Sequence, residues 1–298
     1  MSRTAANLLL LLAAAFWGLG NVAQKTVLEH LDPLSAAGLR SLIGAALLAP
    51  LVILLEPRGH SVAGWWRSLA RVAALFGGAM AVQQTAYLGT SVTNASFLVN
   101  TASVMTPLAA WLLVRERPSA AVALAAAMTL AGAFLLSGGL AGEVTRGDLA
   151  AILSAGLYAV WMVELGRHMQ TFGRPLATAA AQFAGSALLL LPLGFVFGDL
   201  SLPGIRAAAP ELAILGIFST ALAFGLQTVA QRFTSASHAA VIVSAESVFG
   251  AAGAAVLIGE RISPIGAAGA VVVLAAIVYL ALADAEKPVA SGARRALS

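Results

Sequence analysis

The chain lacks cysteine and carries few charged residues, and both absences narrow what it can do. None of its 298 residues is cysteine, so disulfides, iron–sulfur clusters and thiol catalysis are excluded. With no cysteine and only four scattered histidines, a zinc site is not expected. Asp, Glu, Lys and Arg make up 10% of the residues, whereas a soluble domain has roughly 25%. Charge is therefore too scarce for the surface of an ordinary soluble domain.

Catalytic sequence motifs are absent as well. The chain has no His-Glu-x-x-His, no Gly-x-Ser-x-Gly and no phosphate-binding Gly-x(4)-Gly-Lys-Ser/Thr motif. No segment between the apolar runs is long enough for an ATPase domain, so nucleotide-driven pumping by the chain itself is excluded. We expect no enzyme activity, no cofactor and no metal.

Long apolar runs fill most of the chain. Apolar residues make up 60% of it and the mean hydropathy is +0.91. A helix of about 20 apolar residues matches the roughly 30 Å hydrocarbon core of a bilayer. The runs are rich in Ala, Leu and Gly and do not alternate as barrel strands do. They predict an all-α polytopic membrane protein with about ten transmembrane helices, near residues 7–28, 34–55, 68–89, 94–114, 119–138, 148–168, 176–197, 211–231, 238–258 and 264–283.

The basic residues predict how the helices are oriented. Cytoplasmic loops of membrane proteins carry an excess of Lys and Arg. One set of predicted loops holds only Arg146, Arg206 and Arg261. The ends and the opposite loops hold Arg3, Arg58, Arg67, Arg71, Arg115, Arg117, Arg167, Arg174, Arg232, Lys287, Arg294 and Arg295. Both termini are therefore expected in the cytoplasm (N-in/C-in), in a bacterial-type inner membrane. The net charge of +4 is explained by these loops and does not indicate a nucleic-acid partner.

The second half of the chain repeats the first at a shift of 144 residues. Matching segments are Thr90-Ser91 with Thr234-Ser235, Ser103-Val104 with Ser247-Val248, and Glu116-Arg117-Pro118-Ser119 with Glu260-Arg261-Ile262-Ser263. Near the first helix the shift is closer to 141, which pairs Trp17 with Tyr158. Each half has five predicted helices, an odd number, so the second half must enter the membrane from the opposite side. We expect two inverted repeats, residues 1–140 and 147–284, and a disordered cytoplasmic tail, residues 285–298. Many carriers are built in this way around a central site.

Several short motifs, taken in order, resemble the drug/metabolite transporter superfamily and its EamA-type branch. They are Phe16-Trp17-Gly18-Leu19-Gly20-Asn21 with Lys25, then Asp32-Pro33 and Arg40, then the Glu-Arg-x-Ser hairpin that ends each half. Within the family the chain is most similar to the YddG-type exporters of aromatic and other amino acids, without a diagnostic motif. The resemblance implies a central cavity lined by the first four helices of each half, with the fifth packed outside. The second half opens with Tyr158-Ala159-Val160-Trp161 and lacks the Asn and Lys, so family roles transfer less safely there.

Polar and aromatic side chains within the predicted spans are the candidate site residues. A polar group in lipid is costly unless it faces protein or water. The first, third, fourth, sixth, eighth and ninth spans have polar faces, whereas the fifth and tenth are expected to be structural. Expected substrate-binding residues are Trp17, Asn21, Gln83, Tyr87, Asn100, Tyr158, Trp161 and Glu246. Gate or coupling candidates are Lys25, Arg40 and Glu164. Alternatively, Trp17, Tyr158 and Trp161 could be interfacial residues, and Lys25 and Arg40 could snorkel from the outer ends of their helices.

These patterns predict an exporter of small metabolites that works by alternating access, with amino acids, including aromatic ones, as the expected substrates. Aromatic faces would bury an apolar side chain, and amides would serve both the ammonium and the carboxylate. A carrier of drug cations, relying on Glu246, is the first alternative. A sugar-phosphate carrier is disfavoured because it should place several Lys or Arg on cavity faces, and only Lys25 and Arg40 qualify. A membrane enzyme or sensor is less favoured. The expected partners are a small-molecule substrate and the lipid bilayer, with the protein acting as a monomer.

Overall fold

The first half of the chain folds into helices whose starts follow from its sequence. These are α1 (Arg3–Thr26) with the short η1 (Val27–Glu29), α2 (Pro33–Leu55), α3 (Trp65–Gly89), α4 (Val92–Asn100), α5 (Ala102–Val114) and α6 (Ala120–Leu136). Asp32 caps α2 by accepting hydrogen bonds from the backbone of Leu34 and Ser35. Such a cap pairs backbone N–H groups that have no partner inside the helix.

The second half contains α7 (Arg146–Phe172), α8 (Pro175–Phe197), α9 (Leu202–Ala207), α10 (Ala209–Ala213), η2 (Ile214–Phe224), α11 (Gly225–Ala230), α12 (Ala236–Val243), α13 (Glu246–Leu257) and α14 (Pro264–Ala285). This computed structural model describes residues 1–56, 63–138, 144–257 and 261–285, and its regular elements there are all helical. Of the predicted tail, residues 285–298, the first residue still belongs to α14. Residues 286–298, Arg58 and Glu260 lie outside the described residues.

Repeated serines in the two halves have the same structural role. Ser91 caps α4 by accepting from the backbone N–H of Asn94, and Ser235 caps α12 by accepting from that of His238. The backbone N–H of Gly266 in α14 donates to Ser263, as that of Val122 in α6 does to Ser119. The serine of the Glu-Arg-x-Ser motif therefore marks the start of the last helix of each half.

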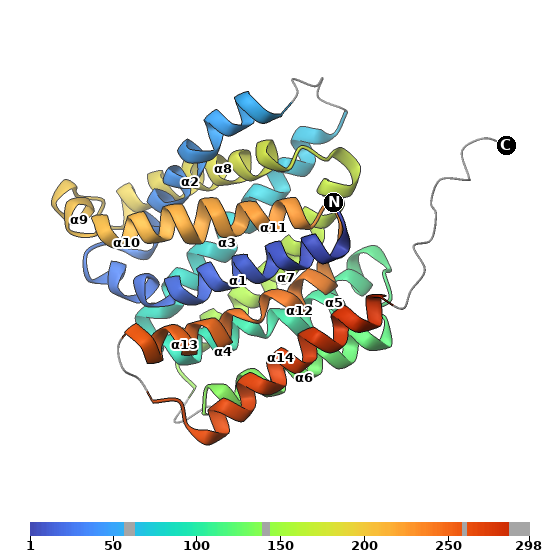
Figure 1. Ribbon diagram of the computed structural model, residues 1–298. Helices are drawn as coiled ribbons and strands as arrows, with labels where there is room; N and C mark the ends of the chain where they lie inside the picture. Colours follow the sequence, from blue (N-terminus) through green and yellow to red (C-terminus); the bar gives the residue numbers. More distant parts are fainter. Residues whose placement is uncertain (57–62, 139–143, 258–260, 286–298) are drawn as a thin grey trace.

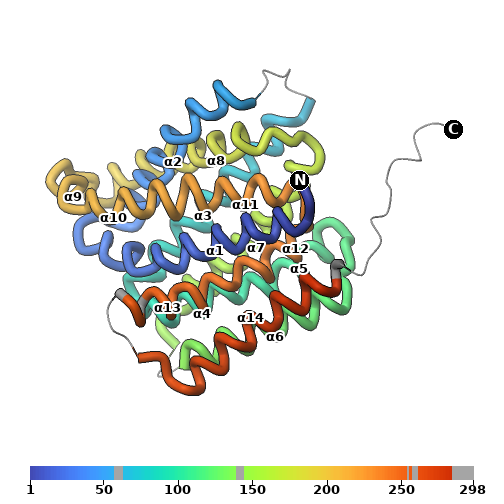
Figure 2. Tube along the Cα trace, viewed as in Figure 1, coloured from blue at the N-terminus to red at the C-terminus, as the bar shows by residue number. Residues whose placement is uncertain are grey.

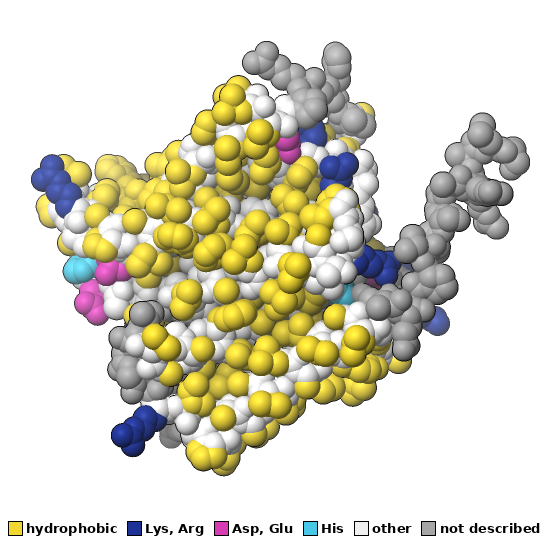
Figure 3. Space-filling view, in the orientation of Figure 1, with side chains coloured by type: hydrophobic (Ala, Val, Ile, Leu, Met, Phe, Trp, Pro, Cys, Tyr) yellow, Lys and Arg dark blue, Asp and Glu magenta, His cyan; other side chains and the backbone are white. Residues whose placement is uncertain are grey.

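Seven helical segments are long and apolar enough to cross a membrane, judged by length and composition. They are Arg3–Glu29, Pro33–Leu55, Val92–Val114, Arg146–Phe172, Pro175–Phe197, Ala209–Ala230 and Pro264–Ala283. Apolar side chains cover the middle of the visible face, and charged side chains lie at its two ends (Figure 3). Together these features describe an integral membrane protein. Among the remaining predicted spans, α6 has 17 residues and the segment 236–257 is divided into α12 and α13.

Three of the predicted spans are not the continuous α-helices that the sequence indicated. The fourth span is interrupted at Thr101, between α4 and α5. The ninth is interrupted between Val243 and Glu246, and most of the eighth is the π-helix η2. Hydropathy detects apolar length but not the local pattern of backbone hydrogen bonds, so it could not reveal these interruptions. Interrupted helices within a membrane are tolerated where they line a cavity or are covered by protein.

The helices form one bundle with its N-terminus and the end of α14 at the same end (Figures 1 and 2). The α2–α8 pair lies at one edge of the bundle, and the α6–α14 pair lies at the opposite edge. Between these edges α1 packs on η2, α12 and α13, while α7 packs on α3, α4 and α5. The main apolar core therefore draws on both halves of the chain.

Candidate functional site

Two cavities lie within the described part of the bundle. The central cavity has a volume of about 70 Å³ and is lined by Trp17, Gln24, Arg40, Gln83, Val99, Asn100, Ala102, Ser103, Tyr158, Trp161, Met162, Phe224, Gln227, Ala240, Val243 and Glu246. A second cavity of about 720 Å³, here called the vestibule, lies at the C-terminal end of α1 and includes Asn21, Lys25, Ser96, Ser247 and Arg261. Pockets for small molecules typically measure about 300–1,000 Å³. The central cavity is smaller than this range, whereas the vestibule lies within it.

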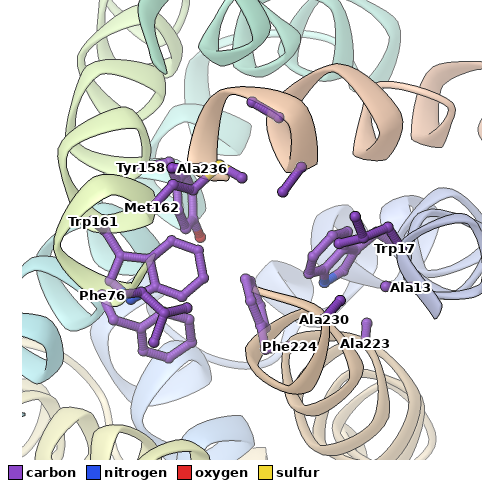
Figure 4. Packing of buried hydrophobic residues seen from close by; sticks show 14 of the residues in the cluster. Ala13, Trp17, Phe76, Tyr158, Trp161, Met162, Ala223, Phe224, Ala230 and Ala236 are labelled. Atoms are coloured by element: carbon purple, nitrogen blue, oxygen red, sulfur yellow. The ribbon is translucent and has the colours of Figure 1, made fainter. Parts of the chain in front are cut away.

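Aromatic side chains from α1, α7 and η2 form one wall of the central cavity, and Phe76 of α3, which is not a lining residue, packs against them. Phe224, the last residue of η2, lies between Trp17 and the group Phe76, Tyr158 and Trp161 (Figure 4). Its ring centroid is 4.6 Å from that of Trp17 and 4.7 Å from that of Phe76, both edge-on. Tyr158 and Trp161 lie one turn apart on α7, so both side chains reach the same wall.

A line of polar side chains crosses the bundle beside this wall. Asn21 Nδ2 donates to Glu246 Oε1 (3.0 Å) and to Ser96 Oγ (3.1 Å). Asn21 Oδ1 accepts from Gln24 Nε2 (2.9 Å). Arg40 Nη1 donates to Gln24 Oε1 (3.2 Å), and Arg40 Nε donates to Thr220 Oγ1 (2.9 Å). The line therefore connects one acid to one base through two neutral amides.

Arg40 lies in the interior of the protein and not at a membrane surface. Its side chain is 2% exposed and lines the central cavity. The sequence placed it near the outer end of its helix, where it could snorkel, and that alternative is wrong. The backbone of α2 directs it towards η2, where Thr220 is its hydrogen-bond partner.

Tyr158 and Trp161 are held by amide side chains, and Trp17 is held by a backbone carbonyl. The Tyr158 hydroxyl donates to Gln83 Oε1 (2.8 Å), and Trp161 Nε1 donates to Gln182 Oε1 (3.1 Å). Trp17 Nε1 donates to the backbone carbonyl of Ser219 in η2 (2.9 Å). Trp17, Tyr158 and Trp161 are all buried, so none of them is an interfacial residue in this structure.

Asn100 and Tyr87 occupy different positions relative to the cavity. Asn100 is the last residue of α4, where the helix is interrupted, and it lines the central cavity. Tyr87 is buried outside the linings of the two cavities, and its hydroxyl is 3.5 Å from Gln24 Nε2 and from Asn21 Oδ1. It therefore packs behind the polar line.

Asn21 lies between the two cavities. It lines the vestibule, while its partner Glu246 lines the central cavity. Lys25, one turn further along α1, lines the vestibule and donates to the backbone carbonyls of Tyr87 and Thr90. Asn21 thus joins the fourth-span helices of both halves, through Ser96 on α4 and Glu246 on α13.

Glu164 lies at the other end of the bundle and lines neither cavity. Its carboxylate is 2.9 Å from Arg167 Nη1 and 3.7 Å from Arg71 Nη1. At the same end, Glu56 accepts hydrogen bonds from the backbone N–H groups of Leu176 (2.6 Å) and Ala177 (3.1 Å) at the start of α8. These contacts tie α7 to α3 and α2 to α8 at the end opposite the vestibule.

Several residues of the site escaped sequence reasoning. Phe224 and Phe76 lie within apolar runs, and nothing in their spacing predicts that their rings pack together beside the cavity. Thr220 and Gln24 were visible as polar residues within spans, but their pairing with Arg40 depends on the packing of α1, α2 and η2. Among the described residues no group of three or more His, Asp or Glu could hold a metal ion.

Comparison with known proteins identifies relatives of the chain. The model of the EamA-like transporter family matches residues 4–138 and again residues 145–282. An uncharacterised transporter of Bacillus subtilis (strain 168), YwfM, is 28% identical over 85% of this chain and 86% of its own length. An uncharacterised transporter of Archaeoglobus fulgidus is 30% identical over 64% of this chain and 68% of its own length. A solved crystal structure shares the fold, with a TM-score of 0.80 and 19% identity, over 96% of this chain and all of that one.

Proposed function

We infer a substrate class and a mechanism from the premise that the chain belongs to the EamA-like transporter family and is a membrane transporter. We propose that it is a secondary exporter of small zwitterionic metabolites, with amino acids, including aromatic ones, as its substrates. It lies in an inner membrane with both termini in the cytoplasm. Its ten membrane-crossing segments form two inverted repeats, residues 1–140 and 147–284.

Three observations support the repeat. The family model matches each half separately, and equivalent serines cap equivalent helices. Contacts between the halves also occur in matching sets: α1 packs on η2, α12 and α13 as α7 packs on α3, α4 and α5. A pseudo-two-fold axis that exchanges the halves accounts for this correspondence.

The observation that carries the substrate class is one acid and one base lining the same aromatic cavity. Glu246 and Arg40 both line it, together with Trp17, Tyr158 and Trp161. A zwitterion complements both charges, and an aromatic or aliphatic side chain complements the rings. A sugar phosphate would require several cationic groups, whereas Arg40 is the only Lys or Arg among the described lining residues.

The two cavities support an outward-facing state of the proposed carrier. With both termini in the cytoplasm, the vestibule lies on the outer side, and the contacts of Glu164 with Arg71 and of Glu56 with Leu176 join helices of the two halves at the cytoplasmic end. The Asn21 bridge between α4 and α13 is already formed, so export would require the cytoplasmic contacts to open and the vestibule beyond this bridge to close. The interruptions within the fourth and ninth spans supply places where the two halves can bend against each other.

Counterflow in proteoliposomes tests this function. Liposomes loaded with unlabelled phenylalanine should accumulate labelled phenylalanine saturably, and liposomes without protein should not. Accumulation that is independent of a pH gradient would identify facilitated exchange. Accumulation that requires the gradient would make Glu246 the first candidate for proton coupling. No accumulation with any amino acid would refute the amino-acid assignment.

A carrier of lipophilic cations is the second candidate function. Glu246 favours it, since a buried carboxylate can pair with a cation that carries no negative group of its own. Arg40 in the same cavity opposes it. Labelled tetraphenylphosphonium in the same liposomes separates the two: accumulation of this cation without that of amino acids would select the alternative.

A further inference from the structure

Two polar atoms, each fully enclosed and each on a residue that lines the central cavity, have no hydrogen-bond partner among the described residues. One is the donor Asn100 Nδ2 and the other is the acceptor Gln227 Oε1. The side chains are almost completely enclosed, with Asn100 8% and Gln227 1% exposed. A buried polar group without a partner is unfavourable, so a ligand that pairs with it gains binding energy.

The repeat explains why Gln227 is left without a partner. Gln227 follows Gln83 by 144 residues, the shift that relates the two halves. Gln83 Oε1 accepts from Tyr158, whose equivalent in the first half is Trp17. Trp17 instead donates its indole N–H to the carbonyl of Ser219 in η2. The acceptor that is occupied in one half is therefore open in the other.

The repeat explains Asn100 in the same way. Its equivalent, 144 residues later, is Ser244, whose hydroxyl donates to the backbone carbonyl of Val241 (2.5 Å). A serine can satisfy itself within its own helix, whereas the longer Asn100 amide extends into the cavity lining without such a partner. The two halves thus contribute one open donor and one open acceptor.

We propose that Gln227 and Asn100 are the specificity-determining pair of this cavity: Gln227 Oε1 accepts an N–H of the substrate ammonium, and Asn100 Nδ2 donates to the substrate carboxylate. The inference rests on the proposed function and adds Gln227 to its binding residues. The two charged residues are already engaged, Glu246 with Asn21 and Arg40 with Gln24 and Thr220. They supply the compensating charge, and the two open amides supply the direct hydrogen bonds.

The test uses three ligands that differ only in their polar groups. Phenylalanine has both the ammonium and the carboxylate, phenethylamine has only the amine, and 3-phenylpropionate has only the carboxylate. Their dissociation constants are measured by thermal-shift titration of the purified protein in detergent. Gln227→Met should weaken phenylalanine and phenethylamine about tenfold or more, because a hydrogen bond to a charged group is lost, and should leave 3-phenylpropionate unchanged. Asn100→Leu should weaken phenylalanine and 3-phenylpropionate and leave phenethylamine unchanged.

Gln83→Met is the matched control, since it makes the same substitution at the equivalent position, where Tyr158 already occupies the acceptor. Its effect should not depend on whether the ligand has an amino group. Gln227→Glu, which keeps an acceptor, should retain phenethylamine binding, and it decides the question if Gln227→Met does not fold. Equal weakening of all three ligands in Gln227→Met, or loss of phenethylamine binding in a folded Gln227→Glu, would overturn the proposal.

The same measurements separate this inference from the proposed function. Binding of phenylalanine that depends on Gln227, without counterflow, would sustain the inference and refute transport. If counterflow and phenylalanine binding are both unchanged in Gln227→Met, the inference is refuted and the proposed transport function stands. Wild-type protein that binds none of the three ligands would overturn both.

Discussion

At the scale of single residues, Glu246 and Arg40 bring opposite charges into an apolar interior. The two charges are joined by the amides of Asn21 and Gln24 and not by direct contact. Amides can accept from the base and donate to the acid at the same time, so both charges are stabilised while they remain along the cavity lining. This arrangement suits a ligand that carries both charges and must be released again.

Glu246→Gln should lower amino-acid exchange about tenfold or more, because it removes the negative charge while keeping the shape and an acceptor for Asn21. Counterflow of labelled phenylalanine measures the effect. The control is Glu29→Gln, which neutralises an exposed carboxylate in η1. Equal exchange in both variants would show that the Glu246 charge takes no part in binding.

Phe224→Ala should destabilise the protein by about 3–5 kcal/mol, because truncating a buried aromatic residue leaves a cavity. Phe224 contacts Trp17, Phe76, Tyr158, Trp161 and Phe183, so the loss affects the whole aromatic wall. Unfolding in a denaturant series measures it. Phe195→Ala is the control, since that ring is 74% exposed. Similar losses for both variants would contradict the central role of Phe224.

Sequence reasoning located most polar members of the site but not their partners. Polar groups stand out in apolar runs, so Asn21, Gln83, Asn100 and Glu246 were visible in advance. Phe224 was not, because a phenylalanine within an apolar run carries no signal of its own. The depth of Arg40 was also missed, since it depends on how α2 packs against η2 and α1.

At the scale of helices, the sequence predicts where spans begin more reliably than which backbone hydrogen-bond pattern, α or π, they adopt. The capping residues Asp32, Ser91 and Ser235 follow breaks in hydropathy, and helices start at each of them. The π-helix of residues 214–224 has no comparable signal. The backbone carbonyl of Ser219 in this helix accepts a hydrogen bond from Trp17, whereas the equivalent residue Tyr158 donates to the side chain of Gln83. Such asymmetry arises from tertiary packing and cannot be deduced from one sequence.

The α6–α14 contact depends on two glycines that let the backbones approach. A Cβ added to Gly269 would lie 2.5 Å from the carbonyl oxygen of Gly132. We expect Gly269→Ala to lower stability by about 1–3 kcal/mol, because the helices must separate to relieve the overlap. Thermal unfolding measures the change. Gly78→Ala is the matched control, since a Cβ there meets nothing within 4 Å. Gly269→Ala as stable as Gly78→Ala would contradict the close approach.

At the scale of the whole molecule, duplication explains both the likeness and the difference between the halves. Equivalent serines cap equivalent helices, and α2–α8 and α6–α14 pair second with second and fifth with fifth. The hydrogen bonds at the centre differ, however, as the glutamines 83 and 227 show. We propose that this scaffold with internal symmetry encloses a site that distinguishes the two ends of its ligand.

The proposed inverted arrangement predicts that equivalent residues lie on opposite sides of the membrane. Because the chain has no cysteine, single cysteines can be labelled without background. In intact cells a membrane-impermeant maleimide should label Arg261→Cys but not Arg117→Cys, which should react only after permeabilisation. Both side chains are exposed. Labelling of both variants from the same side would refute the inverted repeat.

Counterflow driven by ligands that carry one or both charges tests the central claim most directly. Proteoliposomes are loaded with unlabelled phenylalanine, phenethylamine or 3-phenylpropionate, and uptake of labelled phenylalanine is followed. A carrier with Glu246 and Arg40 in one cavity should be driven strongly by internal phenylalanine and weakly by either analogue. Uptake driven equally by phenethylamine and phenylalanine would show that the carboxylate is not recognised, and it would contradict a zwitterion-binding site.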